Sequence, residues 1–361
     1  MKRRDLLSLL TLAPLTSWAM SKLMPKTLQG KSMIKHTAPI DLHWPTQEPF
    51  LFCAHHLDRY PAGNPQLGLE AKHFAGRQMG SDFQEKDGFR LYHGTEIPGF
   101  PVHPHRGFET ITIVRRGYAD HADSLGAAGR YGEGDVQWMT AGSGVQHSEM
   151  FPLLHKDKEN TLELFQIWLN LPKKNKMVPA DFKMLWANKI PRVKKENLEV
   201  SIISGEYADV KFFEAPKNSW AADAANHVNI FLVKMTKDGL FEYPAKEGVE
   251  RSLYFFEGQG ASINGQTING KRAVFVDPSV QLQIKTSGTI EFLMLEAKPI
   301  GEPVVQHGPF VMNTREEIAQ TIRDYQATQF GGWKWQREDM IHGPQIERFA
   351  KYPDGRIERP A

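Results

Sequence analysis

Short hydrophobic runs alternate with turn residues along the chain between residues 47 and 300. Runs of this kind, rich in β-branched and aromatic side chains and bounded by Gly, Asn or Pro, are typical of β-strands. The pattern predicts strands at residues 110–114, 136–139, 162–169, 228–235, 252–256, 281–285 and 291–295. Asn264-Gly265 and Asn269-Gly270 are dipeptides that favour two-residue hairpin turns. Many short strands joined by regular turns indicate jelly-roll barrels or sandwiches.

Two polar interruptions divide this β-rich region. Residues 172–176 read Pro-Lys-Lys-Asn-Lys, and a second break falls near residues 217–226. We therefore predict an all-β protein with two jelly-roll β-barrels, at residues 47–180 and 195–300. Residues 20–46 are expected to form a linker or a first edge segment before the first barrel.

A helical pattern follows the second barrel. Thr314 and Glu317 have the spacing of a capping box, in which a hydroxyl and a carboxyl three residues later bind free backbone N–H groups at a helix start. One face of this helix then carries Ile318, Ile322 and Tyr325. We predict that residues 301–361 form a short C-terminal helix and a tail on the surface.

Composition and charge narrow the possible partners. The chain has 361 residues and a formal net charge of +2, a field too weak to recruit nucleic acid. Its single cysteine, Cys53, excludes an intramolecular disulfide and a metal site built from several thiolates. A nucleic-acid partner is therefore not expected.

The N-terminal residues have the features of an export signal. Arg3 and Arg4 precede an apolar stretch at residues 6–18, and a signal peptidase could cut after Ala19. The paired arginines are similar to those of twin-arginine signals, while an ordinary secretory signal or an uncleaved anchor are the alternatives. The apolar stretch is short for a membrane-spanning helix. We expect residues 1–19 to be a signal peptide and the mature protein to be periplasmic, without stable membrane insertion.

Two pairs of polar residues carry the candidate chemistry. His103 and His105 are two residues apart, and so are His147 and Glu149. On a β-strand this spacing directs both side chains of a pair to the same face. If the two strands are neighbours, three imidazoles and one carboxylate surround a single point. The sequence therefore predicts a metal site with these four residues as ligands.

The residue types alone do not decide whether the site binds a metal, nor which metal it would bind. A lone pair of histidines on a strand is also compatible with ordinary packing, so the alternative is that these residues are structural. The second pair follows a glycine-rich corner at residues 141–144, and its presence beside the first pair favours the metal site. Iron, manganese, copper, nickel, cobalt and zinc all accept imidazole and carboxylate ligands.

Three longer motifs contain or extend these pairs. Residues 103–110, His-Pro-His-Arg-Gly-Phe-Glu-Thr, resemble the first cupin motif in the form that pirins carry. Residues 135–150 resemble the second pirin motif, and residues 306–314 resemble the pirin C-terminal signature. The similarity to the pirin family covers about residues 47–332.

The resemblance to pirins implies a bicupin, in which the N-terminal of two cupin barrels holds one divalent transition metal. The pirin ligands fall on His103, His105, His147 and Glu149 of this chain. Fe(II) is the metal expected first, with Cu, Mn, Ni, Co and Zn as alternatives. The corresponding stretch of the second barrel, residues 243–252, has no histidine, so that barrel is expected to be free of metal.

Five further polar residues lie near these motifs. His55 and His56 stand where many pirins have an acidic segment; either could approach the site, but we expect both to be hydrogen-bonded structural residues. Glu109 is expected to accept a hydrogen bond from a ligand imidazole or a neighbouring arginine rather than to bind metal. His121 is expected on a strand surface or turn, and His93 is a loop residue that could line the barrel mouth.

The resemblance also implies an activity. It points to a metal-dependent dioxygenase of the quercetin 2,3-dioxygenase type, which acts on a small aromatic, flavonol-like enol with O2. In this hypothesis Glu149 is the base that accepts the proton of the enol hydroxyl. The alternative is a non-catalytic metal-binding or redox-sensing interaction protein. A third reading, a cupin isomerase or sugar-binding protein with zinc or no metal, has no feature of the sequence in its favour.

Overall fold

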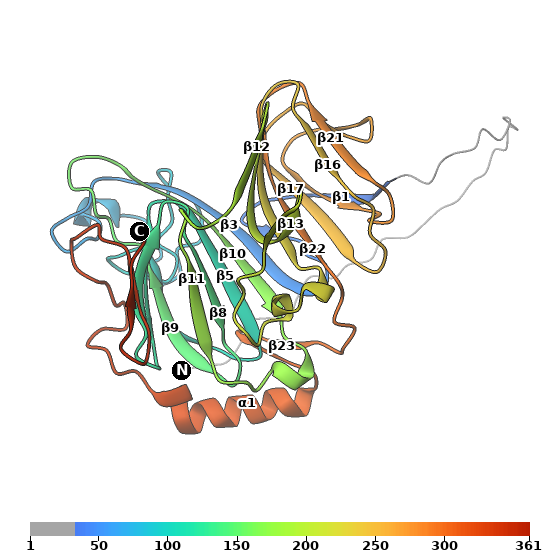
Figure 1. Cartoon of the computed structure of the whole chain (residues 1–361). Helices are drawn as coiled ribbons and strands as arrows, with labels where there is room; N and C mark the ends of the chain where they lie inside the picture. The colour runs from blue at the N-terminus through green and yellow to red at the C-terminus, as the bar shows by residue number, and fades with distance from the viewer. Residues whose placement is uncertain (1–32) are drawn as a thin grey trace, which may run out of the picture. The chain divides into compact units, whose positions relative to one another are not determined.

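Residues 33–361 are described by the computed structural model, and nearly all of their regular structure is β. The strands assemble into antiparallel sheets that build two barrels, with one α-helix near the C-terminus (Figure 1). All seven predicted strand segments coincide with strands of the structure. The predicted all-β, two-barrel fold is therefore confirmed. The predicted signal peptide at residues 1–19 lies outside the described residues.

The first barrel is built from two six-stranded sheets. One has the strand order β11-β8-β5-β10-β3-β2, and the other has the order β26-β25-β7-β6-β9-β4. The bounds in the first sheet are β2 His43–Trp44, β3 Phe50–Tyr60, β5 Phe108–Arg116, β8 Val136–Thr140, β10 Asn160–Asn170 and β11 Asp181–Leu185. In the second they are β4 Gly99–His105, β6 Tyr118–Asp123, β7 Ala128–Gly132, β9 Val145–Met150, β25 Phe349–Lys351 and β26 Ile357–Glu358.

The second barrel pairs an eight-stranded sheet with a four-stranded one. The order in the larger sheet is β1-β20-β17-β22-β15-β13-β12, with β14 paired to β13, and the order in the smaller is β16-β21-β18-β19. The larger sheet contains β1 Ile34–Pro39, β12 Arg192–Lys195, β13 Leu198–Tyr207, β14 Val210–Phe212, β15 Asn229–Met235, β17 Glu250–Gly258, β20 Arg272–Val276 and β22 Ile290–Ala297. The smaller contains β16 Leu240–Tyr243, β18 Ala261–Ile263, β19 Gln266–Ile268 and β21 Leu282–Thr286.

In the second half of residues 20–46 the edge-segment alternative holds and the linker prediction does not. Residues 34–39 form β1, an edge strand of the second barrel that pairs with β20, and residues 43–44 form β2 of the first barrel. This short stretch therefore contributes a strand to each barrel. The alternation of apolar and polar residues in it is too brief to show that pairing from the sequence.

A continuous hydrophobic cluster joins the two barrels. It combines Ile111, Trp138 and Phe165 of the first barrel with Tyr254 and Phe275 of the second. Trp138 is fully buried within this cluster. Side chains on the outer faces of the two sheets thus exclude water from each other, which couples the stability of one barrel to that of the other.

The C-terminal helix forms as the sequence predicts. It is α1, Arg315–Thr328, and the Thr314 hydroxyl accepts a bond from the Glu317 N–H while the Glu317 carboxylate accepts one from the Thr314 N–H. The helix packs beside β24 Phe310–Met312, which pairs with β23 Val305–His307. Short 3-10 segments complete the regular structure: η1 Ala71–His73, η2 Lys173–Asn175, η3 Trp220–Ala222, η4 Ala224–Asn226 and η5 Gln329–Gly331.

The tail after α1 does more than run over the surface. Its strands β25 and β26 extend the sheet of β7, and the Arg130 guanidinium binds the Gly343 carbonyl oxygen as well as the Asp120 carboxylate. The tail thereby closes one side of the first barrel. Its polar, Pro- and Gly-interrupted sequence gave no strand pattern, because these strands are only three and two residues long.

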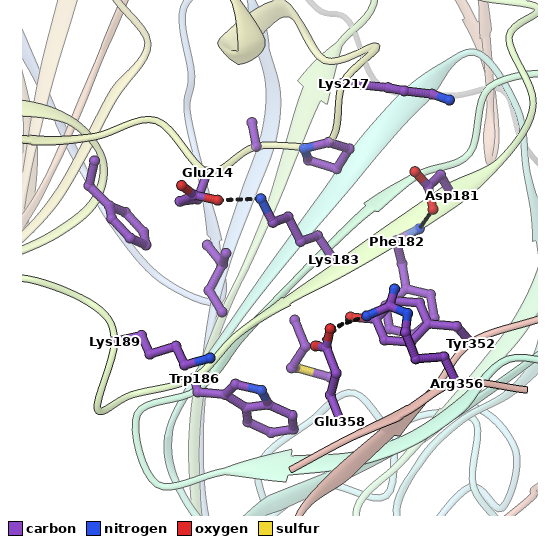
Figure 2. A pocket seen from close by; sticks show the side chains of 15 residues that line it. Asp181, Phe182, Lys183, Trp186, Lys189, Glu214, Lys217, Tyr352, Arg356 and Glu358 are labelled. Carbon is purple, nitrogen blue, oxygen red and sulfur yellow. Dashed lines mark hydrogen bonds and ion pairs between the residues drawn. The ribbon is translucent and has the colours of Figure 1, made fainter. Parts of the chain in front are cut away.

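A wide polar groove follows the outer edge of β11. It has a volume of about 670 Å³ and lies between the segment after β14 and the β25–β26 hairpin. Lys183 pairs there with Glu214, and Arg356 pairs with Glu358, as Figure 2 shows. None of the predicted metal ligands lines this groove. In the part of the chain that the structure describes, no helix has the length and apolar character needed to cross a membrane.

Candidate metal centre

The two motif strands lie side by side, as a shared site requires. β4 pairs antiparallel with β9, and His103 stands opposite His147 in the register. A bulge in β4 between Phe100 and His103 resets the pairing just before the first histidine. Because side chains alternate along a strand, His103 and His105 share the face that also carries His147 and Glu149.

The three imidazoles converge. One ring nitrogen from each of His103, His105 and His147 lies within 4.8 Å of the others. The ring centroids are separated by 4.8 Å between His103 and His105, 4.4 Å between His103 and His147, and 4.9 Å between His105 and His147. Three of the four predicted ligand residues are thus grouped around one point.

Glu149 lies beside this group and is held by its neighbours. Its Oε2 is 4.0 Å from Nε2 of His147. Oε1 accepts hydrogen bonds from the hydroxyls of Thr112 at 2.9 Å and Tyr131 at 3.2 Å, and Oε2 accepts one from Gln166 Nε2 at 2.7 Å. The carboxylate is therefore fixed in orientation, with one side directed at the imidazoles.

The protonation states of the histidines suit a metal. Burial lowers the pKa of His103, His105 and His147 below the usual range, because an imidazolium loses its hydration there. The rings are consequently neutral near pH 7 and can offer a lone pair. Nδ1–H of His103 donates to the Pro101 carbonyl oxygen at 2.9 Å, which leaves Nε2 of that ring as the free donor.

The donor set fits a divalent first-row metal. Both ring nitrogens of His147 and Nδ1 of His105 are buried without a hydrogen-bond partner among residues 33–361. Leaving such groups unpaired is costly, and coordination would satisfy a nitrogen of each ring. Three imidazoles with an adjacent carboxylate are the ligand types that iron, manganese, nickel, copper, cobalt and zinc accept.

A cavity of about 290 Å³ opens in front of the imidazoles. Its walls are mostly aromatic or aliphatic, and they include Phe52, Phe83, Phe100, Phe151, Leu164 and Trp168. The polar groups in its wall are the site residues Thr112, Gln166 and Glu149 together with His43, His56 and His93. Such a space suits a flat, largely apolar ligand with a few polar groups.

The loop between β4 and β5 is anchored from two directions. The buried Lys176 ammonium donates to the carbonyl oxygens of Gly107 and Val311. Gly107 has a φ of +84°, and a Cβ there would lie 2.0 Å from the Val311 oxygen, so only glycine fits. Arg106 binds the Asp324 carboxylate of α1 at 2.7 Å. These contacts fix the strand end that carries His105.

Two neighbouring residues, His121 and Glu109, differ from their predicted roles. His121 is fully buried, with its ring centroid 5.4 Å from that of His147, so the expected surface or turn position is wrong. Glu109 accepts hydrogen bonds from Thr140 and Ser219, not from a ligand imidazole or an arginine. It faces the second barrel because its position on β5 alternates away from the site.

The histidines near the cavity divide into two kinds. His55 is hydrogen-bonded to Glu163 and stacked on Phe165, the structural role expected for it. His56, one residue later, points the other way and lines the cavity, and its Nδ1 has no partner in the described chain, contrary to expectation. His93 lines the cavity as well.

Thr112, Tyr131 and Gln166 support Glu149 without having been predicted. Thr112 and Gln166 are polar residues within the mainly apolar runs of β5 and β10, and Tyr131 is a buried residue of β7. That signal is visible in the sequence for Thr112 and Gln166, which lie in the apolar runs of β5 and β10. It becomes informative only when the strand face toward the site is known.

Comparisons with known proteins agree with this architecture. Residues 67–169 match the family model described as Pirin, and residues 230–331 match the model of the Pirin C-terminal cupin domain. The chain belongs to the pirin family.

Individual relatives extend this family assignment. A pirin-like protein of Solanum lycopersicum is 37% identical to this pirin over 236 residues, covering 63% of this chain and 75% of that protein. Pirin of Homo sapiens is 32% identical over 249 residues, covering 67% and 81% respectively. A solved structure of quercetin 2,3-dioxygenase from Acinetobacter baumannii has a TM-score of 0.65 and 27% identity, and covers 83% of this chain and 96% of that one.

Proposed function

We propose that this pirin is a metal-dependent dioxygenase of the quercetin 2,3-dioxygenase type, acting on a flavonol-like enol with O2. The observation that carries the proposal is the grouping of the three imidazoles beside Glu149, with His103, His105 and Glu149 in the wall of an aromatic cavity. The structural similarity to a quercetin 2,3-dioxygenase supports it. His103, His105, His147 and Glu149 would hold one divalent metal, and Fe(II) is the metal we propose.

The residues of the site have separable tasks. A divalent metal, when bound, supplies Lewis-acid chemistry that makes an enol hydroxyl more acidic. Oε2 of Glu149 accepts a hydrogen bond from Gln166 and retains one lone pair, which would either help to hold the metal or, once free of it, accept the enol proton. Thr112 and Tyr131 keep the other carboxylate oxygen in place, so the proton acceptor stays in one orientation.

The cavity walls position the substrate and exclude water. Phe100 and Phe151 present rings with an interplanar angle of 81°, and Trp168 lies 5.6 Å from His105 between ring centroids. Aromatic walls bind a planar ring system by burial and by edge or face contacts. Their apolar surface also limits solvent around the carboxylate that takes the proton.

The test is elemental analysis of freshly purified protein combined with O2 consumption on a panel of flavonols. About one metal per chain with O2 uptake would support the proposal. Glu149→Gln should then lower the rate by about 100-fold or more, an effect in the range for a lost general base. Metal-replete protein without O2 uptake on any flavonol or related enol would contradict the proposal and favour the non-catalytic metal-binding alternative.

A further inference from the structure

His56 is a histidine in the cavity wall outside the proposed metal set. It lies on β3, is 5% exposed and lines the cavity with His103 and His105. Its Nδ1 is buried without a partner among the described residues, and no hydrogen bond to the other nitrogen is found there. Burial lowers the pKa of His56 to about 3, so the ring is neutral and offers one N–H and one lone pair.

Two aromatic rings fix the orientation of the His56 imidazole. Tyr92 and Phe100 meet it edge-on, with ring centroids at 4.8 Å and 6.0 Å. The Tyr92 hydroxyl donates to Asp58 at 2.5 Å, and Asp58 also binds Arg90. Because Tyr92 is itself anchored, these ring contacts restrict the orientation of the His56 imidazole.

The same Phe100 ring reaches from His56 to the candidate metal centre. Its centroid is 6.0 Å from that of His56 and 6.2 Å from that of His103. A planar molecule lying against Phe100 with one end at the three imidazoles would therefore bring another part of its ring system to His56.

Most other polar groups of the cavity are hydrogen-bonded within the protein, and His43 is exposed to solvent. Thr112, Gln166 and Glu149 hydrogen-bond to one another, and Nδ1 of His93 is bonded to the Gly80 carbonyl oxygen. The His56 imidazole therefore has an unused hydrogen-bonding group that a ligand hydroxyl would pair with. A site that keeps an unpaired polar group rejects a ligand lacking the complementary group, because the desolvation cost is then not repaid.

We propose that His56 is a specificity-determining residue, which hydrogen-bonds a hydroxyl group carried by a planar polyphenol away from its metal-binding end. The inference rests on the proposed function and narrows its substrate class to enols whose ring system bears further hydroxyls. A hydroxyl both donates and accepts, so it pairs with either tautomer of the imidazole.

The probes are quercetin and 3-hydroxyflavone, which share the 3-hydroxy-4-keto end and differ in the remaining hydroxyls. Binding is measured without O2 on the metal-loaded protein by quenching of tryptophan fluorescence. His56→Phe keeps the ring packing and removes both nitrogens, whereas His56→Gln keeps a donor and an acceptor. His55→Phe is the matched control on the same strand, since His55 faces Glu163 and Phe165 instead of the cavity.

The wild type and His55→Phe should bind quercetin about tenfold tighter than 3-hydroxyflavone, the value of one good hydrogen bond. His56→Phe should remove most of that preference by weakening quercetin alone, and His56→Gln should restore part of it. Equal preference in His56→Phe and the wild type would overturn the inference, and so would wild-type protein without any preference or without binding of either probe.

The two proposals fail in distinguishable ways. If the protein prefers quercetin to 3-hydroxyflavone through His56 but consumes no O2 with any flavonol, the role of His56 in binding stands and the dioxygenase proposal is wrong. Turnover with a quercetin preference that survives His56→Phe would sustain the dioxygenase and remove the role of His56.

Discussion

The two barrels share an architecture and differ in what fills them. In the first barrel, inward positions of the strands carry Thr112, Glu149 and Gln166, and a cavity of about 290 Å³ remains. In the second barrel, Phe292 and Met294 on β22 and their neighbours form a buried apolar cluster. The interior of the second barrel is therefore packed with apolar side chains. The interior of the first barrel instead has polar side chains around a cavity.

The buried polar groups of the two barrels also differ in how they are paired. In the second barrel the Arg251 guanidinium donates through Nε to Glu296, which also accepts a bond from Asn229, while Nη1 of Arg251 is left without a partner among residues 33–361. In the first, nitrogens of His105 and His147 have no such partner within residues 33–361. What distinguishes the first barrel is that its unpaired nitrogens belong to imidazoles grouped around one point, an arrangement that a fold can tolerate where function requires it.

The largest expected effect tests whether the metal belongs to the first barrel alone. His147→Ala should reduce bound metal from about one per chain to near zero and lower any O2 uptake by about 100-fold or more. The barrel should stay folded, because the side chain lies beside the cavity. His227→Ala, which changes a histidine at a cavity of the second barrel, should leave the metal content unchanged. Elemental analysis and circular dichroism decide the matter; wholesale unfolding of His147→Ala would mean that the metal is structural.

The second prediction concerns the apolar contact between the barrels. Trp138 is fully buried in the shared cluster, so Trp138→Ala should lower the free energy of unfolding by about 3–5 kcal/mol. Val280→Ala, at a side chain that is 36% exposed, should cost less than about 0.5 kcal/mol. Urea denaturation measures both changes. A loss below about 1 kcal/mol for Trp138→Ala would show that the cluster does not hold the barrels together.

A smaller effect is expected from a carboxyl group at the same contact. Glu109 is fully buried between the Thr140 and Ser219 hydroxyls, and burial raises its pKa from 4.5 to about 7. The unfolded chain therefore ionises first as the pH rises. Stability from this group is complete below about pH 4.5, declines between about pH 4.5 and 7, and is level above, on the order of 2–3 kcal/mol in total.

Glu109→Gln isolates that contribution. The free energy of unfolding of the wild type minus that of the variant should fall between pH 5 and 7.5, since other titrating groups, such as Asp58, are common to both proteins. Urea denaturation across this pH range provides the measurement. A difference that does not change with pH would show that Glu109 has an ordinary pKa in the folded protein.

The sequence was sufficient for the fold because its signals are local. Hydrophobic runs and turn dipeptides located the strands, and the Thr314–Glu317 capping box located α1. The spacing of His103, His105 and His147 likewise predicts their grouping, since strand alternation alone directs them to one face. The roles of His56, His121 and Glu109 could not be predicted, because they depend on which face of a strand meets the cavity or the other barrel.

The smallest effect is expected from a substitution that gives the first barrel an apolar side chain of the kind that fills the second barrel. Gln166→Leu removes the donor at 2.7 Å from Oε2 of Glu149 and replaces it with hydrocarbon of similar size. Metal affinity or turnover should fall about tenfold, the lower end for loss of a residue that orients a ligand.

The free energy of unfolding should change little in the same variant, because the Glu149 oxygen that loses its donor lies at a cavity and can be hydrated there. Gln283→Leu, on β21 of the second barrel, serves as the control and should leave metal affinity unchanged. Metal titration and urea denaturation of both variants separate the two quantities. If Gln166→Leu kept full metal affinity and full turnover, the orientation of Glu149 would not depend on its hydrogen bonds, and the polar interior of the first barrel would need another explanation.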